Sequence, residues 1–325
     1  MSEQAPGWIE QLDGNDPLLR RLEMVRLLRS GTPSSAVALQ FDALEDYVLL
    51  IGQRFAKYGL PGIMTEEDTE RFHAINPEEI RICSYNLQGV GKDGAFRFRR
   101  MARELSAYRP DLIAFQEVVS GAGIDDTSGQ VARWLSAMTG EHYRSHFTYC
   151  HQFMEKYPEG VAICGRTALT GVTSIDLTAN LAKGLRPSMD RRAQMAETTL
   201  LGKKILLVSV HLDHVEVGGV RLAQAEKLLS EIDKLTGNTD YYALILAGDF
   251  NDVEDSPALK LLKDAGFKDA YRVCHEAGGN TFAVPKPNAR IDYILLKGPA
   301  EVVSAEVILN NPDFSDHLGV LAVLR

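Results

Sequence analysis

Polar side chains follow four apolar segments of the chain, and they are of the types that hydrolytic sites use. Carboxylate and amide oxygens bind hard divalent cations, and carboxylates and imidazoles exchange protons near neutral pH. The residues in question are Asn86, Glu117, His211, Asp249 and Asn251. Their types predict a site for metal-assisted or acid–base chemistry, provided that the fold brings them together.

Each of these residues comes directly after a segment that has the composition of a buried strand. Asn86 follows Ile80–Tyr85, and Glu117 follows a run that ends at Gln116. Taken singly, an asparagine after a strand is usually a turn residue, and a lone histidine is usually a satisfied polar group. The repeated placement favours a shared site, because polar residues at strand ends gather at one rim of a sheet.

Seven apolar runs predict strands, and four amphipathic segments between them predict helices. The strands are Ile80–Tyr85, Leu112–Phe115, Gly160–Cys164, Ile205–Val210, Leu244–Ala247, Ile291–Leu296 and Gly319–Leu324. The helices are Phe96–Tyr108, Gly129–Met138, Gly219–Leu235 and Ser256–Ala265. This mixture predicts sheets covered by helices.

The first 78 residues differ in character and predict a small all-α domain, followed by a second domain over residues 79–325. Three helices are expected there, at Leu18–Arg29, from a Ser34 or Ser35 cap to Phe41, and at Glu45–Tyr58. Gly31 and Gly59 suit the helix ends. The acidic segment Thr65–Glu70 reads as a linker. The three helices resemble a helix-turn-helix module.

Two functions are open for these helices: DNA binding, or docking on the second domain or on a protein partner. A recognition helix needs cations to meet phosphates. Residues 1–79 instead hold seven Lys or Arg and fourteen Asp or Glu, a net charge of −7. This acidity disfavours DNA, since it repels the duplex.

Composition narrows the class of protein further. The 325 residues carry a net charge of −9, so no global positive field attracts polyanions, although a local patch could still bind nucleic acid. The four cysteines lie far apart and favour free thiols over disulfides. We expect no signal peptide and no membrane span, and hence a cytoplasmic protein.

Seven short motifs, in this order, resemble the endonuclease/exonuclease/phosphatase superfamily over residues 80–325. They are Ser84–Asn86, Pro110–Glu117, Gly160–Ile163, His211–His214, Gly248–Asn251, Arg290–Tyr293 and Ser315–His317. The resemblance implies a deoxyribonuclease I-like fold: a four-layer α/β/β/α sandwich with the active site at one end. The N-terminal helices lie outside this pattern.

The resemblance also implies a magnesium site, in which Mn²⁺ could substitute. Mg²⁺ keeps much of its water and uses one or two protein carboxylates. Glu117 matches the principal ligand of the family. Asn86 stands in the position that helps through its amide oxygen, and Asp316 is the third participant.

Five residues match the family's catalytic positions. Asp249 matches the residue that orients and deprotonates water, with Asn251 placing that base or the phosphate. His317 resembles the imidazole that binds a non-bridging oxygen or manages a proton, oriented by Asp292. His211 resembles a second imidazole, which occurs in the deoxyribonuclease I, sphingomyelinase and inositol-phosphatase branches.

Two further features of the sequence lie between these motifs. Arg191 and Arg192 could bind phosphate in bidentate fashion, or they could belong to an ordinary surface loop. Thr281–Phe282 resembles a segment common in bacterial members, with the structural role of pinning a loop beside the site.

The leading hypothesis is a divalent-metal-dependent hydrolase of phosphate esters, a phosphodiesterase or phosphatase acting on a small-molecule or lipid-derived substrate. The near alternative is a DNA or RNA nuclease on the same scaffold. Residues 80–325 hold 28 Lys or Arg and 30 Asp or Glu, so charge separates the two only weakly. A third alternative is a DNA-binding regulator with a degenerate hydrolase domain.

Overall fold

Three short helices form the N-terminal part of the chain. The computed structural model describes residues 17–58, 63, 78–90, 94–121, 126–215, 219–237 and 239–325. The N-terminal residues Met1–Asp16, on which the expectation of no signal peptide rests, and the expected linker Thr65–Glu70 lie outside these residues. The helices belong to one of two compact units, and the second unit holds Asn76–Leu135 and Glu141–Arg325. Each unit is described by itself.

The three predicted N-terminal helices are confirmed as α1 (Pro17–Arg29), α2 (Ser34–Gln40) and α3 (Glu45–Tyr58). Their apolar faces meet in a cluster that includes Met24, Val37 and Val48. The expected serine cap of α2 is wrong: Pro33 occupies the cap position, without a side-chain hydrogen bond. Ser34 lies inside the helix instead, and its hydroxyl donates to Glu45 Oε1 at 2.5 Å.

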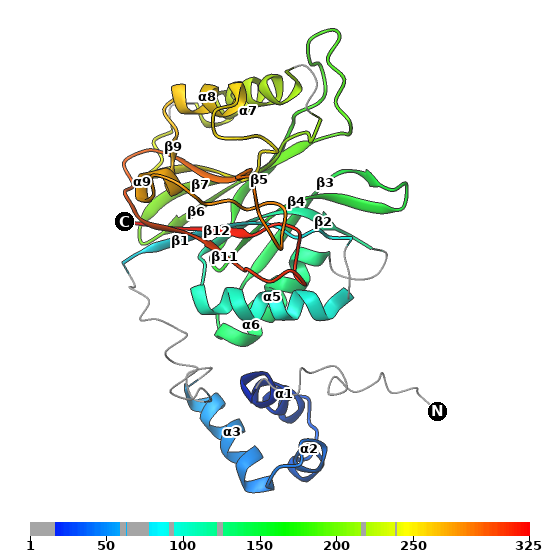
Figure 1. Ribbon diagram of the computed structural model, residues 1–325. Coiled ribbons are helices and arrows are strands. Elements are labelled where there is room, and N and C mark those ends of the chain that lie inside the picture. Colours follow the sequence, from blue (N-terminus) through cyan, green and yellow to red (C-terminus); the bar gives the residue numbers. More distant parts are fainter. Residues whose placement is uncertain are drawn as a thin grey trace. The chain divides into compact units, whose positions relative to one another are not determined.

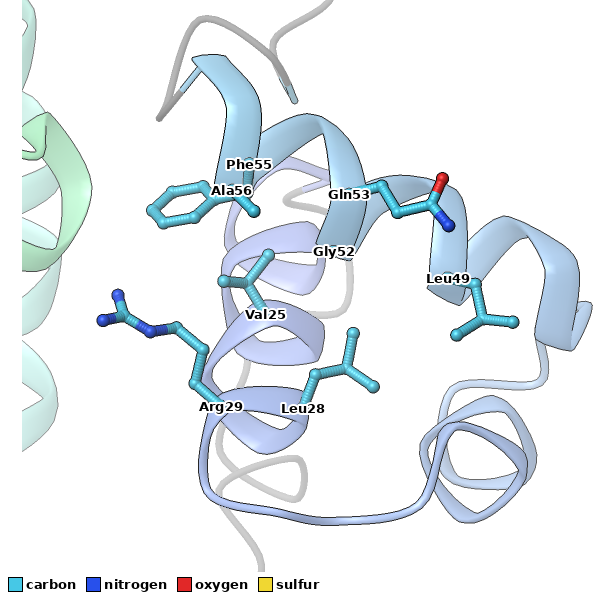
Figure 2. Close-up of a pocket in the computed structure, with 8 residues that line it drawn as sticks. All are labelled: Val25, Leu28, Arg29, Leu49, Gly52, Gln53, Phe55 and Ala56. Atoms are coloured by element: carbon cyan, nitrogen blue, oxygen red, sulfur yellow. The ribbon is translucent and has the colours of Figure 1, made fainter.

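A pocket of about 600 Å³ lies between α1 and α3 (Figure 2). The two helices approach closely at Gly52, where an added Cβ would lie 2.8 Å from Leu28 Cδ1. The pocket is lined by Val25, Leu28, Arg29, Leu49, Gly52, Gln53, Phe55 and Ala56. Most of these side chains are apolar, so the pocket has no constellation for catalysis.

The second unit contains two six-stranded mixed sheets. The first sheet has the order β11-β12-β1-β2-β4-β3. Its strands are β1 (Ile80–Asn86), β2 (Leu112–Val119), β3 (Arg144–Phe153), β4 (Tyr157–Gly165), β11 (Val302–Ile308) and β12 (Gly319–Leu324). The second sheet has the order β5-β6-β7-β8-β10-β9. Its strands are β5 (Thr170–Asp176), β6 (Arg192–Leu200), β7 (Lys203–His211), β8 (Ala243–Asp249), β9 (Lys268–Asp269) and β10 (Asp292–Lys297).

Helices cover the outer face of each sheet, which gives four layers (Figure 1). On the first sheet lie α5 (Gly94–Tyr108) and α6 (Thr127–Thr139), and on the second lie α7 (Val220–Thr236) and α8 (Pro257–Asp264). A short helix, α9 (Ala270–Cys274), contacts β10 and β11. The predicted α/β sandwich is therefore confirmed.

Apolar side chains fill the space between the two sheets. Ile82 and Ala114 of the first sheet belong to the same buried cluster as Leu207 and Ala247 of the second. A separate cluster joins the second sheet to α7 and α8, for example through Val208 and Leu228. Burial on this scale is the main favourable term in folding, and it holds the two sheets face to face.

The seven predicted strands and four predicted helices are present, but five strands were not predicted: the edge strands β3, β5, β9 and β11, and the interior strand β6. β5 is exposed over Thr170–Ser174, so it lacks the apolar run that identifies a buried strand. Among the described residues, none of the helices combines the length and the apolar character needed to cross a bilayer.

Candidate active site

The polar strand ends meet at one rim of the sandwich because of how the strands pair. β1 and β2 are parallel, with Asn86 level with Gln116. In the second sheet β7 and β8 are parallel, with His211 level with Asp249. β10 runs antiparallel to β8, so its first residue, Asp292, also lies level with Asp249. Residues distant in sequence therefore reach the same edge.

Glu117 is turned toward the second sheet by an irregularity in β2. The pairing of β2 with β4 shifts between Phe115 and Val118, and Glu117 adopts a left-handed φ of 49°. A β-bulge redirects a side chain in this way. Glu117 Oε1 accepts a hydrogen bond from Asn86 Nδ2 at 3.0 Å.

Asn86 links the two sheets. Its Nδ2 also donates to Asp249 Oδ2 at 3.1 Å, while its Oδ1 accepts from the backbone N–H of Gln88 at 3.0 Å. The amide nitrogen therefore faces the carboxylates and the amide oxygen faces the chain. A role of Asn86 as a metal ligand through Oδ1 stays a prediction, because that oxygen would first have to leave Gln88.

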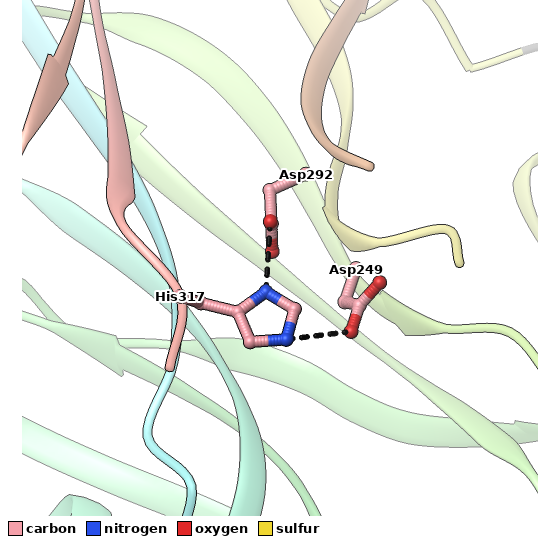
Figure 3. Close-up of side chains that lie close together, drawn as sticks. All are labelled: Asp249, Asp292 and His317. Atoms are coloured by element: carbon pink, nitrogen blue, oxygen red, sulfur yellow. Dashed lines mark hydrogen bonds and ion pairs between the residues drawn. The ribbon is translucent and has the colours of Figure 1, made fainter. Parts of the chain in front are cut away.

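His317 lies between two aspartates (Figure 3). Its Nδ1 is 2.9 Å from Asp292 Oδ2, and its Nε2 is 3.7 Å from Asp249 Oδ2. Burial lowers the pKa of His317, but Asp292 and Asp249 more than offset this and raise the pKa to about 10. At neutral pH the ring is an imidazolium, which donates from both nitrogens.

Asp249, at the end of β8, accepts the hydrogen bond from Asn86 of the other sheet. Its Oδ1 accepts from the backbone N–H of Asn251 at 2.8 Å, and Asn251 Nδ2 donates to Leu212 O at 3.0 Å. Burial raises the pKa of Asp249 to about 6, although His317 opposes the change. A carboxylate with this pKa is ionised at neutral pH and can accept a proton.

Glu117 has a raised pKa as well. Burial is the main cause, the negative charge of Glu159 adds to it, and the hydrogen bond from Asn86 opposes it, so that the pKa is about 7. Glu159 is itself buried and lies 3.2 Å from His151 Nε2. The sequence indicated His151 only as part of a region that often shapes the substrate pocket in this family, and its pairing with Glu159 was not predicted, because Glu159 lies in an unremarkable strand segment.

His211 contacts Arg191 rather than a carboxylate on its Nδ1 side. Arg191 Nη1 lies 3.0 Å from His211 Nδ1, and His211 Nε2 lies 3.5 Å from Asp249 Oδ2. Burial lowers the pKa of His211 well below its usual value, and the charge of Arg191 lowers it further. His211 is therefore a neutral imidazole.

The two arginines predicted to act as a pair are separated. Arg191 is buried beside His211, whereas Arg192 begins β6 and reaches Asp176 Oδ2 at 3.5 Å. Adjacent residues of an extended segment point to opposite faces, which explains the separation. Asp316 flanks the cluster: it is partly exposed, and its backbone carbonyl accepts from Val284 N at 2.9 Å.

Three residues around His317 support its position. Ser315 Oγ donates to Asn86 O at 2.8 Å and accepts from His317 N at 3.1 Å. The Phe282 ring packs on the imidazole with centroids 4.8 Å apart. Thr281 Oγ1 accepts from Asp292 N at 3.3 Å. The Thr281–Phe282 segment thus lies beside the site, as the family resemblance implied.

The cluster has the donors and the charge to hold a divalent cation. Among the described residues, ligand atoms of Asp249, Asp292 and His317 all lie within 4.8 Å of one another. Asp292 Oδ1 is buried without a hydrogen-bond partner in the described part of the chain. The raised pKa values of Glu117 and Asp249 indicate desolvated carboxylates with too little positive charge around them. A cation would relieve this.

Comparison with known proteins identifies the family of this chain. The sequence model of the Endonuclease/Exonuclease/phosphatase family matches residues 83–317. The chain belongs to this family. The matched residues contain every member of the cluster from Asn86 to His317. No curated protein sequence matches the chain.

Solved structures of other proteins share the fold. One is a family protein from Leptotrichia buccalis, with a TM-score of 0.63 and 22% identity over 76% of this chain and 99% of that one. The mannosyl-6-phosphatase of Bacteroides thetaiotaomicron has a TM-score of 0.60 and 20% identity, over 76% and 99%. ANGEL2, a 2',3'-cyclic phosphatase, has a TM-score of 0.60 and 16% identity, over 76% and 95%.

Proposed function

We propose that this family member is a divalent-metal-dependent hydrolase of phosphate esters, a phosphodiesterase or phosphatase. The observation that carries the proposal is the convergence on Asp249 Oδ2. Asn86 Nδ2 lies 3.1 Å from this oxygen, His211 Nε2 3.5 Å and His317 Nε2 3.7 Å. A buried carboxylate surrounded by donors from both sheets suits a base that must be held in one orientation.

The proposed metal is Mg²⁺, with Mn²⁺ as a substitute. Glu117 is the proposed principal ligand, with Asn86 and Asp316 as the other participants, because hard cations prefer oxygen donors. A bound cation would shield the phosphate charge and polarise the attacking water. We do not assign His317 as a ligand, since an imidazolium with its Nδ1 proton on Asp292 has no free electron pair.

The other side chains of the site have separate proposed roles in catalysis. Asp249 accepts the proton of the attacking water, and its orientation is fixed by the Asn251 backbone N–H on Oδ1. His317, charged and held by Asp292, donates a hydrogen bond from Nε2 to a non-bridging phosphate oxygen, where negative charge develops. Arg191 adds a buried positive charge beside His211. Arg192 has no place in the proposed site, since it faces Asp176.

A small or lipid-derived ester is the proposed substrate class. Two proteins that share the fold are a mannosyl-6-phosphatase and a 2',3'-cyclic phosphatase, and their substrates support small esters. The nearly balanced charge of residues 80–325 gives no net positive charge to attract a long polyanion. A nuclease remains the second candidate on the same residues.

The N-terminal helices are proposed to contact a protein rather than DNA. Several large apolar side chains of this region are exposed, among them Leu39, Leu44 and Leu50, and exposed apolar groups favour a protein surface. We also propose a reducing compartment such as the cytoplasm, because all four cysteines are free thiols and three are buried.

A substrate panel tests the proposal. Phosphate monoesters, phosphodiesters, phospholipids and oligonucleotides are each incubated with Mg²⁺, with Mn²⁺ and with chelator. We expect turnover of a small or lipid-derived ester that requires the metal. Hydrolysis that persists in chelator would exclude the metal-dependent mechanism, and hydrolysis of oligonucleotides alone would favour the nuclease.

Two substitutions test the assigned roles. Asp249→Ala and His317→Ala should each lower kcat by about 10²- to 10⁴-fold, the usual contribution of a positioned acid or base. Circular dichroism should report an intact fold in both, and Arg192→Met, outside the site, should keep full activity. Normal turnover in either alanine variant would refute its role.

A further inference from the structure

Arg191 has an unusual partner for a buried arginine. Its side chain is only 4% exposed, and its guanidinium lies within hydrogen-bond distance of an imidazole nitrogen, His211 Nδ1, at 3.0 Å. Its Nε has no hydrogen-bond partner among the described residues. Burying a cation is costly unless it is paired and hydrogen-bonded, so a contact with an imidazole in place of a carboxylate needs an explanation.

The chemistry of the two groups leaves one arrangement of protons. A guanidinium carries five N–H donors and no acceptor, and it stays charged in proteins. His211 Nδ1 must therefore accept, and it carries no proton. The single ring proton then sits on Nε2, the nitrogen that lies 3.5 Å from Asp249 Oδ2. His211 can neither give a proton from Nδ1 nor accept one at Nε2.

We propose that Arg191 is a positioning residue that locks His211 in its neutral Nε2–H tautomer and so keeps an N–H directed at Asp249. The tautomer follows from the contact alone, whereas its effect on turnover rests on the proposed hydrolase function. Arg191 acts through His211 and does not need to touch the substrate.

This arrangement gives the two imidazoles of the site different charges and different hydrogen-bond partners. His317 faces Asp292 through Nδ1, so a carboxylate accepts its proton there. His211 faces a cation at the same ring position. The first ring is a charged donor, and the second is a neutral donor that cannot act as the proton source for a leaving group. His211 is thereby excluded as a proton donor or acceptor, and the proposed proton acceptor of the site is Asp249.

Nuclear magnetic resonance on the metal-free protein measures the tautomer directly. Long-range ¹H–¹⁵N spectra separate protonated from unprotonated ring nitrogens, and His211→Gln assigns the signals by removing them. In the wild-type protein we expect an unprotonated Nδ1 and a protonated Nε2. A protonated Nδ1 in the wild-type spectrum would overturn the proposal, whatever the variants do.

Arg191 variants then connect the tautomer to turnover. Arg191→Met removes the donor and should allow the Nδ1–H form, with kcat lowered about 10- to 100-fold, as is usual for the outer partner of an active-site imidazole, and KM little changed. Arg191→Lys keeps an obligate donor and should restore the Nε2–H form and part of kcat. Arg192→Met is the matched control on the neighbouring residue.

The outcomes separate this proposal from the proposed function. A raised KM with unchanged kcat in Arg191→Met would identify a phosphate-binding arginine and overturn the positioning role. Unchanged ring signals in the folded Arg191→Met protein would do the same. If no phosphate ester is hydrolysed by the wild-type chain, the proposed function fails, and the spectrum alone still decides whether Arg191 sets the tautomer.

Discussion

At the scale of single residues, the sequence predicts the kinds of groups in the site better than their partners. Glu117 and Asp249 lie near each other as expected from their positions after buried strands, and His317 lies beside Asp249 as the family resemblance implied. The contact between Arg191 and His211 could not be read from the chain, because Arg191 and Arg192 look equivalent in sequence. Only the direction of each side chain from the backbone separates them.

The raised pKa values of Glu117 and Asp249, about 7 and about 6, predict pH-dependent metal binding. A raised carboxyl pKa means that the folded protein holds protons more tightly than the unfolded chain. Without metal, these two groups therefore stabilise the fold at low pH, and their contribution is lost as pH rises through the folded values. A metal needs the ionised forms and must displace the protons.

We expect the rise in Tm caused by Mg²⁺ to be small near pH 5 and to grow toward pH 8. Each displaced proton should strengthen apparent affinity by about tenfold per pH unit below the folded pKa. Differential scanning fluorimetry at fixed ionic strength measures this, and Glu117→Gln should flatten the dependence. Equal Mg²⁺ effects at both pH values would argue against Glu117 as the metal ligand.

At the scale of elements, most interior strands were predictable and the edge strands were not. Interior strands such as β7 and β8 are covered on both faces and have continuous apolar runs. The edge strand β5 is exposed over most of its length, so its sequence resembles a loop, and the interior strand β6 interrupts its apolar residues with polar ones. The site depends mainly on predicted interior strands, so its location could be predicted although all four sheet edges were missed.

Gly248 shows how closely two of these interior strands approach. A Cβ at this position would lie 1.8 Å from Val210 O, and no rotamer relieves that contact. We expect Gly248→Ala to lower the free energy of unfolding by about 1–3 kcal/mol or more and to displace the following Asp249, lowering kcat as well. Urea unfolding followed by circular dichroism measures the first effect and the assay the second.

Thr173→Ala provides the control, because Thr173 lies on an exposed part of edge strand β5 and its substitution should change stability by less than about 0.5 kcal/mol. Wild-type stability in Gly248→Ala would mean that β7 and β8 can separate without cost.

At the scale of the whole molecule, charge disfavours nucleic acid as a partner. The chain has a net charge of −9, most of it in residues 1–79. Binding to duplex DNA gains strength chiefly from cations that replace counterions on phosphates. The helix-turn-helix-like order of α1 to α3 therefore does not by itself support DNA recognition.

We expect the full chain to show no saturable, salt-sensitive binding to duplex DNA. Fluorescence anisotropy of a labelled duplex, titrated with protein in chelator at two salt concentrations, measures this without cleavage. Tight binding that falls steeply with added salt would contradict the expectation and favour the nuclease or the DNA-binding regulator.

The placement of the cluster on both sheets has a consequence for the protein interior. Asn86 and Glu117 belong to one sheet and His211 and Asp249 to the other, and the layer between them is apolar, with small side chains such as Ala247. Dispersion and burial have no preferred direction, so this layer sets the spacing of the reacting groups only through the volumes of its members. Evolutionary selection for turnover would then constrain interior alanines that never meet a substrate.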